Sequence, residues 1–261
     1  MANSADDCFF APLGDDRWRA TAHTSGPWDA AFQHGGPPSA LLGRAIELTE
    51  PREQMLVGRV TVEILGPIPV GELTLRSRVV RTGRRVELVE AALTAGGRDV
   101  ATARGWRVLR TEASAVPSLH ATAPPLPGAG PSLDKGAWLG GYLEAVEWRF
   151  VNGYFGQPGP ATAWTRLRHP LVPDETPSPL QRVLAVADSG NGISSELDIT
   201  GWHFINPELT VHVHREAAGE WICLDAATTI TPGGAGLASS VLSDLDGPVA
   251  VGAQLLLVSR R

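Results

Sequence analysis

Residues 34–51 read HGGPPSALLGRAIELTEP, and this stretch decides the fold of the chain. Apolar residues recur in it at helical spacing: Leu41, Leu42, Ala45, Ile46 and Leu48. Pro51 ends the run, because proline has no N–H to continue a helical hydrogen-bond ladder. The pattern predicts a helix over residues 40–50, preceded by a tight glycine-rich turn.

A series of strands is expected after this helix. Valine and isoleucine alternate with Thr61 and Glu63 in residues 60–64, and strand-like runs follow at residues 72–81, 85–94 and 100–109. Glycines separate the runs, which is typical of antiparallel strands joined by turns. One buried helix followed by such strands requires a sheet that curls around the helix and covers its apolar surface. This is the plan of the α+β hot-dog fold.

The same order of elements recurs in the second half. Ser178 and Pro179 are the expected N-cap and first residue of a second helix, which runs to about Asp188. Strands are predicted at residues 147–151, 161–168, 204–213, 221–230, 238–245 and 249–258. We therefore predict a double hot-dog with an N-terminal repeat over residues 1–110, an Ala- and Pro-rich linker over 111–140 and a C-terminal repeat over 141–261.

Composition excludes several classes of protein. The formal net charge of −6 argues against nucleic acid as a partner, because a general basic field is absent. Cys8 and Cys223 are the two cysteines, too few and too far apart in sequence for a disulfide framework or a CxxC metal site. Neither a signal peptide nor a membrane-spanning apolar run is evident, which favours a cytoplasmic protein.

Several motifs together resemble the bacterial acyl-CoA thioesterase II family. They are FQHGG at residues 32–36, ADS at 187–189, FINPELTVH at 204–212 and the strand that contains Gln254. The resemblance implies a double hot-dog enzyme in which Asp188, Asn206 and Gln254 orient the hydrolytic water. Asn206 stands where the family has Thr or a similar polar residue, so the hydroxyl of Thr210 or of Ser189 is an alternative for that position.

These residue types suit thioester hydrolysis. The reaction needs a water nucleophile, a group that accepts or steers its proton and donors for the developing oxyanion. We expect Asp188 to accept the proton and the Asn206 and Gln254 amides to fix the water, with no cofactor or metal. His34, Gly35 and Gly36 are the expected substrate-binding residues at a helix start, together with Ser189 and Thr210.

The two repeats are predicted to be functionally unequal, although a first-half site is an open alternative. Gly105 of the first half aligns with Gln254 of the second half. Glu47 lies on the first predicted helix near the position that Asp188 occupies on the second predicted helix. Each site residue also has a structural interpretation: Asp188 as a loop cap, Asn206 before Pro207 as a turn opener, and Gln254 as a half-exposed strand residue. His203, His212 and His214 are interpreted as a solvated strand face without a metal.

The predicted function is hydrolysis of an acyl-CoA substrate to the free acid and CoA. One alternative is a catalytically silent module that binds acyl-CoA or another lipid in the same cavity. Another is a hot-dog dehydratase, with His34 as its histidine and Asp29 as the nearest acid in sequence. Open edges of a hot-dog sheet further predict a homo-oligomer.

Overall fold

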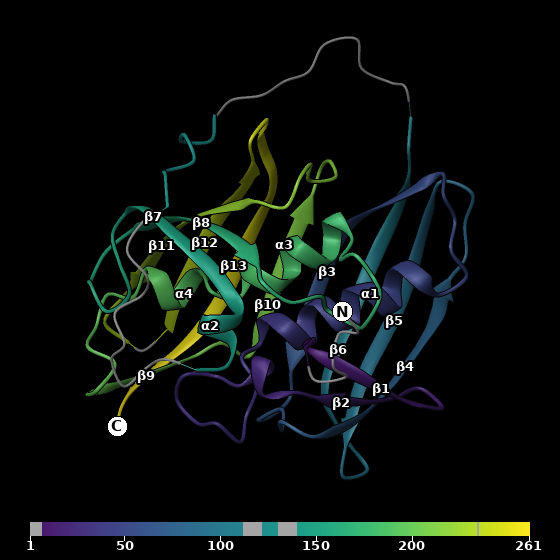
Figure 1. Ribbon diagram of the computed structural model, residues 1–261, viewed down its shortest axis with the longest axis horizontal. Coiled ribbons are helices and arrows are strands. Elements are labelled where there is room, and N and C mark those ends of the chain that lie inside the picture. The colour runs from purple at the N-terminus through teal and green to yellow at the C-terminus, as the bar shows by residue number, and fades with distance from the viewer. Residues whose placement is uncertain (1–6, 112–121, 130–139, 234) are drawn as a thin grey trace.

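The computed structural model describes residues 7–111, 122–129, 140–233 and 235–261 (Figure 1). Most of the predicted linker lies outside these ranges. The first half contains β1 (Phe10–Gly14), β2 (Arg17–Ala20), the 3-10 helix η1 (Ala22–Thr24), α1 (Gly36–Leu48), β3 (Met55–Ile64), β4 (Glu72–Arg81), β5 (Val86–Ala95) and β6 (Arg98–Leu109). The second contains α2 (Tyr142–Ala145), β7 (Val146–Asn152), β8 (Ala161–Leu167), α3 (Pro179–Ala187), α4 (Gly190–Ile193), β9 (Trp202–Ile205), β10 (Glu208–Val213), β11 (Ile222–Ile230), β12 (Ala235–Asp244) and β13 (Gly247–Arg260).

The two halves have the same strand order and meet at one seam. The order is β1-β2-β4-β5-β6-β3 in the first half and β7-β8-β11-β12-β13-β10 in the second. β3 and β10 pair antiparallel at the centre, with Thr61 opposite Thr210. This repeated α+β topology, with one long helix in each half, confirms the predicted double hot-dog architecture.

The predicted start of α1 was wrong. The helix begins at Gly36, four residues before the predicted start at Ala40, and Thr49 is its C-cap. Pro37 and Pro38 fit in the first turn because the N–H groups there have no intrahelical acceptor. For α3 the prediction is confirmed: Ser178 Oγ accepts a hydrogen bond from the Gln181 N–H at 3.2 Å, and Pro179 is the first helical residue.

The predicted strand over residues 204–213 is two strands in the structure. β9 pairs with β13, and β10 pairs with both β13 and β3, with Asn206 and Pro207 between them. Pro207 has no N–H for a sheet ladder, although its carbonyl oxygen accepts from the Ile64 N–H at 2.7 Å. The interruption turns Asn206 out of the strand register and toward the end of α3.

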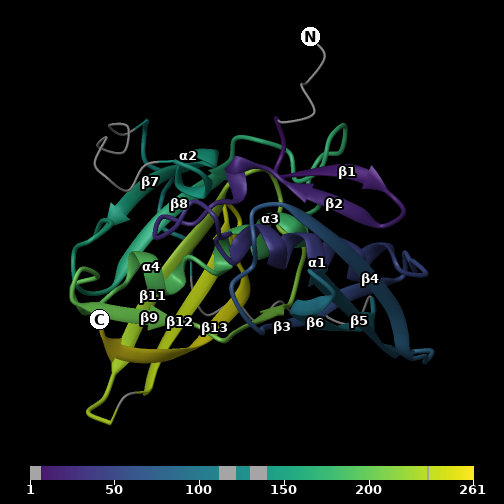
Figure 2. The ribbon, with the colours of Figure 1, turned by 90° about the horizontal axis from the view of Figure 1, so that it is seen from below.

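Helices α1 and α3 pack against each other in the middle of the molecule (Figures 1 and 2). Figure 2 shows β3, β6 and β5 on one side of this pair and β1 and β2 on the other. The contact is close at Gly43, where a Cβ atom would lie 2.3 Å from Leu184 Cδ1. Nearly all apolar residues of both helices are buried, which makes the pair the centre of a continuous core.

A buried ion pair fixes the C-terminal end of α1. The Arg107 guanidinium, in β6, donates to Glu87 Oε2 at 2.7 Å, and only 3% of the Arg107 side chain is exposed. It also donates to the carbonyl oxygens of Ile46, Thr49 and Glu50. A cation is favourable at a helix C-terminus because the last carbonyl groups have no intrahelical donor.

Within the part of the chain that the structure describes, no helix is long and apolar enough to cross a membrane.

Candidate active site

Three residues predicted from sequence meet at the C-terminal end of α3, and we call them the Asp188 cluster: Asp188, Asn206 and Gln254. Asp188 is the C-cap of α3 and is 3% exposed. Its Oδ1 atom accepts from Asn206 Nδ2 at 2.7 Å and from Gln254 Nε2 at 3.1 Å. Two amide donors therefore hold one oxygen of a buried carboxylate in a fixed position.

Gln254 is bonded at both ends of its amide. Nε2 donates to the backbone oxygen of Asp188 at 3.0 Å, in addition to the carboxylate, and Oε1 accepts from the Asn191 N–H at 3.1 Å. A backbone N–H only donates, so the Asn191 contact fixes which amide atom is the oxygen. Burying the amide would cost about 1–3 kcal/mol without these partners. The half-exposed strand interpretation does not fit a side chain that is 2% exposed.

The second oxygen of Asp188 faces His34. His34 Nδ1 lies 3.3 Å from Asp188 Oδ2 and accepts from the Gly36 N–H at 3.1 Å. Burial lowers the pKa of the His34 imidazole, and the Asp188 carboxylate opposes this only in part. A neutral ring whose Nδ1 accepts from Gly36 cannot donate to Asp188 from that nitrogen. Among the described residues, no hydrogen-bond donor is directed at Oδ2, which leaves it available to a water molecule.

The N-terminus of α1 provides backbone donors beside this carboxylate. Gly35 is the N-cap, and its N–H has no acceptor among the described residues. Pro37 and Pro38 have no N–H, and the Gly36 N–H donates to His34 Nδ1, so the Gly35 N–H is the donor that remains at this helix start. A helix N-terminus carries partial positive charge, which favours both the carboxylate and an oxyanion beside it.

Both glycines are required by close contacts. A Cβ on Gly35 would lie 2.6 Å from Asp188 Oδ2, and one on Gly36 would lie 2.1 Å from the backbone oxygen of Ala185. The first contact is with a side-chain end and the second with a rigid helix backbone. The HGG motif therefore allows α1 to approach α3 until its N-terminus touches the carboxylate.

We expect Gly35→Ala to lower the rate of the thioester hydrolysis predicted from the sequence by about 10²-fold, with little change in stability. The added Cβ displaces the Asp188 carboxylate by about 1 Å, and a displaced carboxylate is no longer aligned with the reacting atoms. The backbone φ of −67° at Gly35 suits alanine, so folding is not strained. Steady-state turnover and thermal melting measure the two effects. Gly36→Ala is the comparison and should instead lower the melting temperature, since Ala185 O cannot move aside. Equal decreases in melting temperature in the two variants would contradict the expectation that Gly35→Ala affects mainly turnover and Gly36→Ala mainly stability.

Ser189 and Thr210 lie apart from the hydrogen bonds of the Asp188 cluster. Ser189 Oγ contacts the Tyr142 hydroxyl at 2.7 Å, and Thr210 Oγ1 bonds to Thr61 Oγ1 and Glu208 Oε2 at the central seam. Of the three residues considered for the middle position, Asn206 is the one bonded to Asp188.

Tyr142 was missed by the sequence reasoning. Its ring stacks on His34 with centroids 3.9 Å apart and planes at 11°, and its hydroxyl donates to Ala185 O at 2.9 Å. Burial raises the pKa of the Tyr142 phenol, so it stays protonated. Tyr142 belongs to α2, more than 100 residues after His34, and no local pattern links the two.

Family models match both halves of the chain. The model for the acyl-CoA thioesterase C-terminal domain matches residues 119–258, and the model for the N-terminal domain matches residues 24–108. The chain belongs to the acyl-CoA thioesterase family. The resemblance seen in the HGG, ADS and FINPELTVH segments is thereby confirmed. No curated protein sequence matches this member of the family.

Solved structures of other proteins share the fold over nearly the full length. A Thermobifida fusca protein assigned as a thioesterase II is 18% identical, covers 99% of this chain and 98% of its own, and has a TM-score of 0.74. An Alicyclobacillus acidocaldarius protein described as having a hot dog fold is 16% identical, covers 99% of both chains and has a TM-score of 0.70. Acyl-CoA thioesterase II TesB2 of Mycobacterium marinum is 15% identical, covers 98% and 96%, and has a TM-score of 0.67.

A second carboxylate, partly buried, lies at the other end of the helix pair in this thioesterase-family chain. Glu47, near the end of α1, accepts from Ser178 Oγ at 2.7 and 2.8 Å and from Gln181 Nε2 at 3.1 Å, both at the start of α3. A cavity of about 200 Å³ opens here. Gly105 provides no amide on this side, and a Cβ there would lie 2.6 Å from Ile46 Cγ2.

Glu47 should make stability depend on pH. Burial raises the pKa of its carboxyl, against the hydrogen bonds from Ser178 and Gln181. The folded chain therefore holds this proton more tightly than the unfolded chain. The resulting contribution to the free energy of unfolding is fully present below the unfolded pKa of about 4.3, and it is lost as the pH rises through the pKa of Glu47 in the folded chain. We expect Glu47→Gln to raise the melting temperature relative to wild type, by more at pH 7 than at pH 4. A pH-independent difference would contradict this account.

Proposed function

We propose that the chain hydrolyses acyl-CoA thioesters at the Asp188 cluster. The observation that carries the proposal is a buried carboxylate whose Oδ1 accepts two amide hydrogen bonds while its Oδ2 has no directed donor among the described residues. Membership of the acyl-CoA thioesterase family supports the same substrate class.

The proposed step uses groups already in contact. A water bound at Asp188 Oδ2 gives its proton to the carboxylate as its oxygen attacks the thioester carbonyl carbon. The Gly35 N–H, with the N-terminus of α1 behind it, stabilises the oxyanion that forms. Collapse of the tetrahedral intermediate breaks the carbon–sulfur bond, and the CoA thiolate takes the proton from Asp188. The products are a free acid and CoA, and no cofactor takes part.

The substrate is proposed to enter over Gly35 and Asn206. Both residues are partly exposed, whereas Asp188 and Gln254 beneath them are buried. Trp28 lies beside His34, with the two ring centroids 5.8 Å apart and with 56% of its surface exposed. An exposed indole beside a reaction site is suited to an apolar or aromatic part of a substrate.

Thiol release from short, medium, long and aromatic acyl-CoAs tests the function on the wild-type protein. We expect turnover on at least one of them, undiminished by a chelator. Saturable acyl-CoA binding with no thiol release on any substrate would overturn hydrolysis and favour the silent binding module. Isothermal titration with the same panel separates this outcome from a failure to bind.

One observation favours a dehydratase as the second candidate. The structure pairs His34 with Asp188 at 3.3 Å, whereas Asp29, the acid considered from sequence, is exposed and accepts from the Ala31 N–H. A histidine beside a carboxylate is capable of acid–base chemistry on a hydroxyacyl thioester. The His34 ring is however stacked on Tyr142 and bonded to Gly36, which holds it in place. An assay of crotonyl-CoA hydration, monitored by the decrease in enoyl absorbance, tests this candidate.

A further inference from the structure

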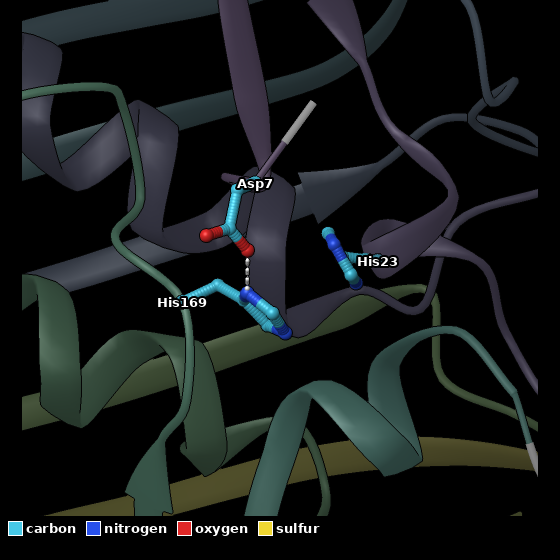
Figure 3. Close-up of side chains that lie close together, drawn as sticks. All are labelled: Asp7, His23 and His169. Atoms are coloured by element: carbon cyan, nitrogen blue, oxygen red, sulfur yellow. Dashed lines mark hydrogen bonds and ion pairs between the residues drawn. The ribbon is translucent and has the colours of Figure 1, made fainter. Parts of the chain in front are cut away.

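Asp7, His23 and His169 form a cluster far from each other in sequence, which we call the Asp7 cluster (Figure 3). Asp7 precedes β1, His23 lies in η1, and His169 follows β8. The three side chains converge from separate segments, as Figure 3 shows. Two segments come from the first half of the chain and one from the second.

The potential ligand atoms are close together. One carboxylate oxygen and one ring nitrogen from each histidine all lie within 4.8 Å of one another. His169 Nδ1 is 2.6 Å from Asp7 Oδ1, and the two imidazole rings stack with centroids 3.8 Å apart and planes at 21°. Ligand atoms in a tetrahedral zinc site, with bonds of about 2.0 Å, lie about 3.3 Å apart. The 2.6 Å contact and the 4.8 Å limit lie on either side of this spacing.

The backbone around the cluster is held firmly. Phe9 and Phe10 N–H groups donate to the carbonyl oxygens of Pro170 and Leu171 at 3.1 and 2.9 Å, which ties the first segment to the third. Thr21 Oγ1 donates to Cys8 O at 2.6 Å, which ties the first segment to η1. Buried residues of these three segments include Cys8, Phe9, Phe10, Thr21 and Leu171, whereas all three ligand candidates are partly exposed. The scaffold is rigid, and an ion can reach the side chains from solvent.

We propose that the Asp7 cluster binds one divalent transition-metal ion, with zinc as the best match. Two neutral imidazoles and one carboxylate are the ligands that zinc takes in proteins, whereas magnesium and calcium prefer sites made mainly of oxygen. Three protein ligands leave a fourth position for water. The ion joins the segment before β1 to the loop after β8 and so clamps the two halves of the chain together.

Zinc binding to the chelator-treated full-length protein tests the proposal by isothermal titration. We expect about one zinc per chain, a melting temperature higher by about 5 °C at a hundredfold excess over Kd, and a visible absorption band when cobalt replaces zinc. Magnesium should produce none of these changes. The double variant His23→Ala with His169→Ala should lose at least tenfold in zinc affinity.

The matched control is His212→Ala with His214→Ala, which removes two exposed histidines on β10 and after it. The control should bind zinc like the wild type. The proposal is overturned if the wild type binds no zinc, if the His23 and His169 variant keeps wild-type affinity, or if the control loses it equally. Melting without metal confirms that each variant is folded, so a loss of binding is assigned to the ligands.

Discussion

Asp188→Asn is expected to lower the rate of thioester hydrolysis by about 10²- to 10⁴-fold, the contribution typical of one general base. Asparagine keeps an oxygen for the hydrogen bonds from Asn206 and Gln254 but cannot accept a proton from water. The amide nitrogen takes the place of Oδ2, an atom that accepts no hydrogen bond from the described residues in the wild type. The variant should therefore fold normally, with a melting temperature at or above that of the wild type.

Glu47→Gln is the matched control for this variant. Glu47 is also a carboxylate at the end of a central helix, partly buried, with donors from the start of the partner helix. We expect its turnover to equal that of the wild type on the acyl-CoA that the wild type hydrolyses best. A loss in Glu47→Gln with full activity in Asp188→Asn would place the reaction in the first half of the chain and contradict the proposed site.

Arg107→Met is expected to lower the free energy of unfolding by about 3–5 kcal/mol, the typical loss when one partner of a buried ion pair is removed. The variant leaves the Glu87 carboxylate, which is 5% exposed at its side chain, without its closest cation. It also removes the donor that caps the carbonyl groups at the end of α1. The methionine side chain is apolar and unbranched, so it fills much of the space without replacing either interaction.

Arg104→Met, on the same strand, is the control for this change. Arg104 pairs with Glu90 on the surface, with 61% of its side chain exposed. Exposed pairs contribute about 0–1 kcal/mol, because water and salt screen them. Urea denaturation of both variants measures the difference. A loss in Arg107→Met no larger than that in Arg104→Met would show that the buried pair does not hold the end of α1.

The repeated architecture could be predicted because its signals are local. Helical spacing in residues 40–48, strand alternation and turn glycines each depend on near neighbours in the chain. Asp188, Asn206 and Gln254 were proposed as one cluster from the resemblance to the acyl-CoA thioesterase II family, and the structure brings them within hydrogen-bond distance. The start of α1 was misplaced because residues 34–39 were interpreted as a glycine-rich turn, although two prolines are compatible with a first helical turn.

The sequence by itself determined that two helices of similar pattern are each followed by a set of strands, and which polar residues interrupt their apolar runs. Tertiary structure alone decided that α1 begins against the Asp188 carboxylate, that Tyr142 stacks on His34 and that Asp7, His23 and His169 converge. The physical reason is range: periodicity records which face of one element is buried, whereas these contacts depend on how the β3–β10 seam and the α1–α3 packing bring distant elements together.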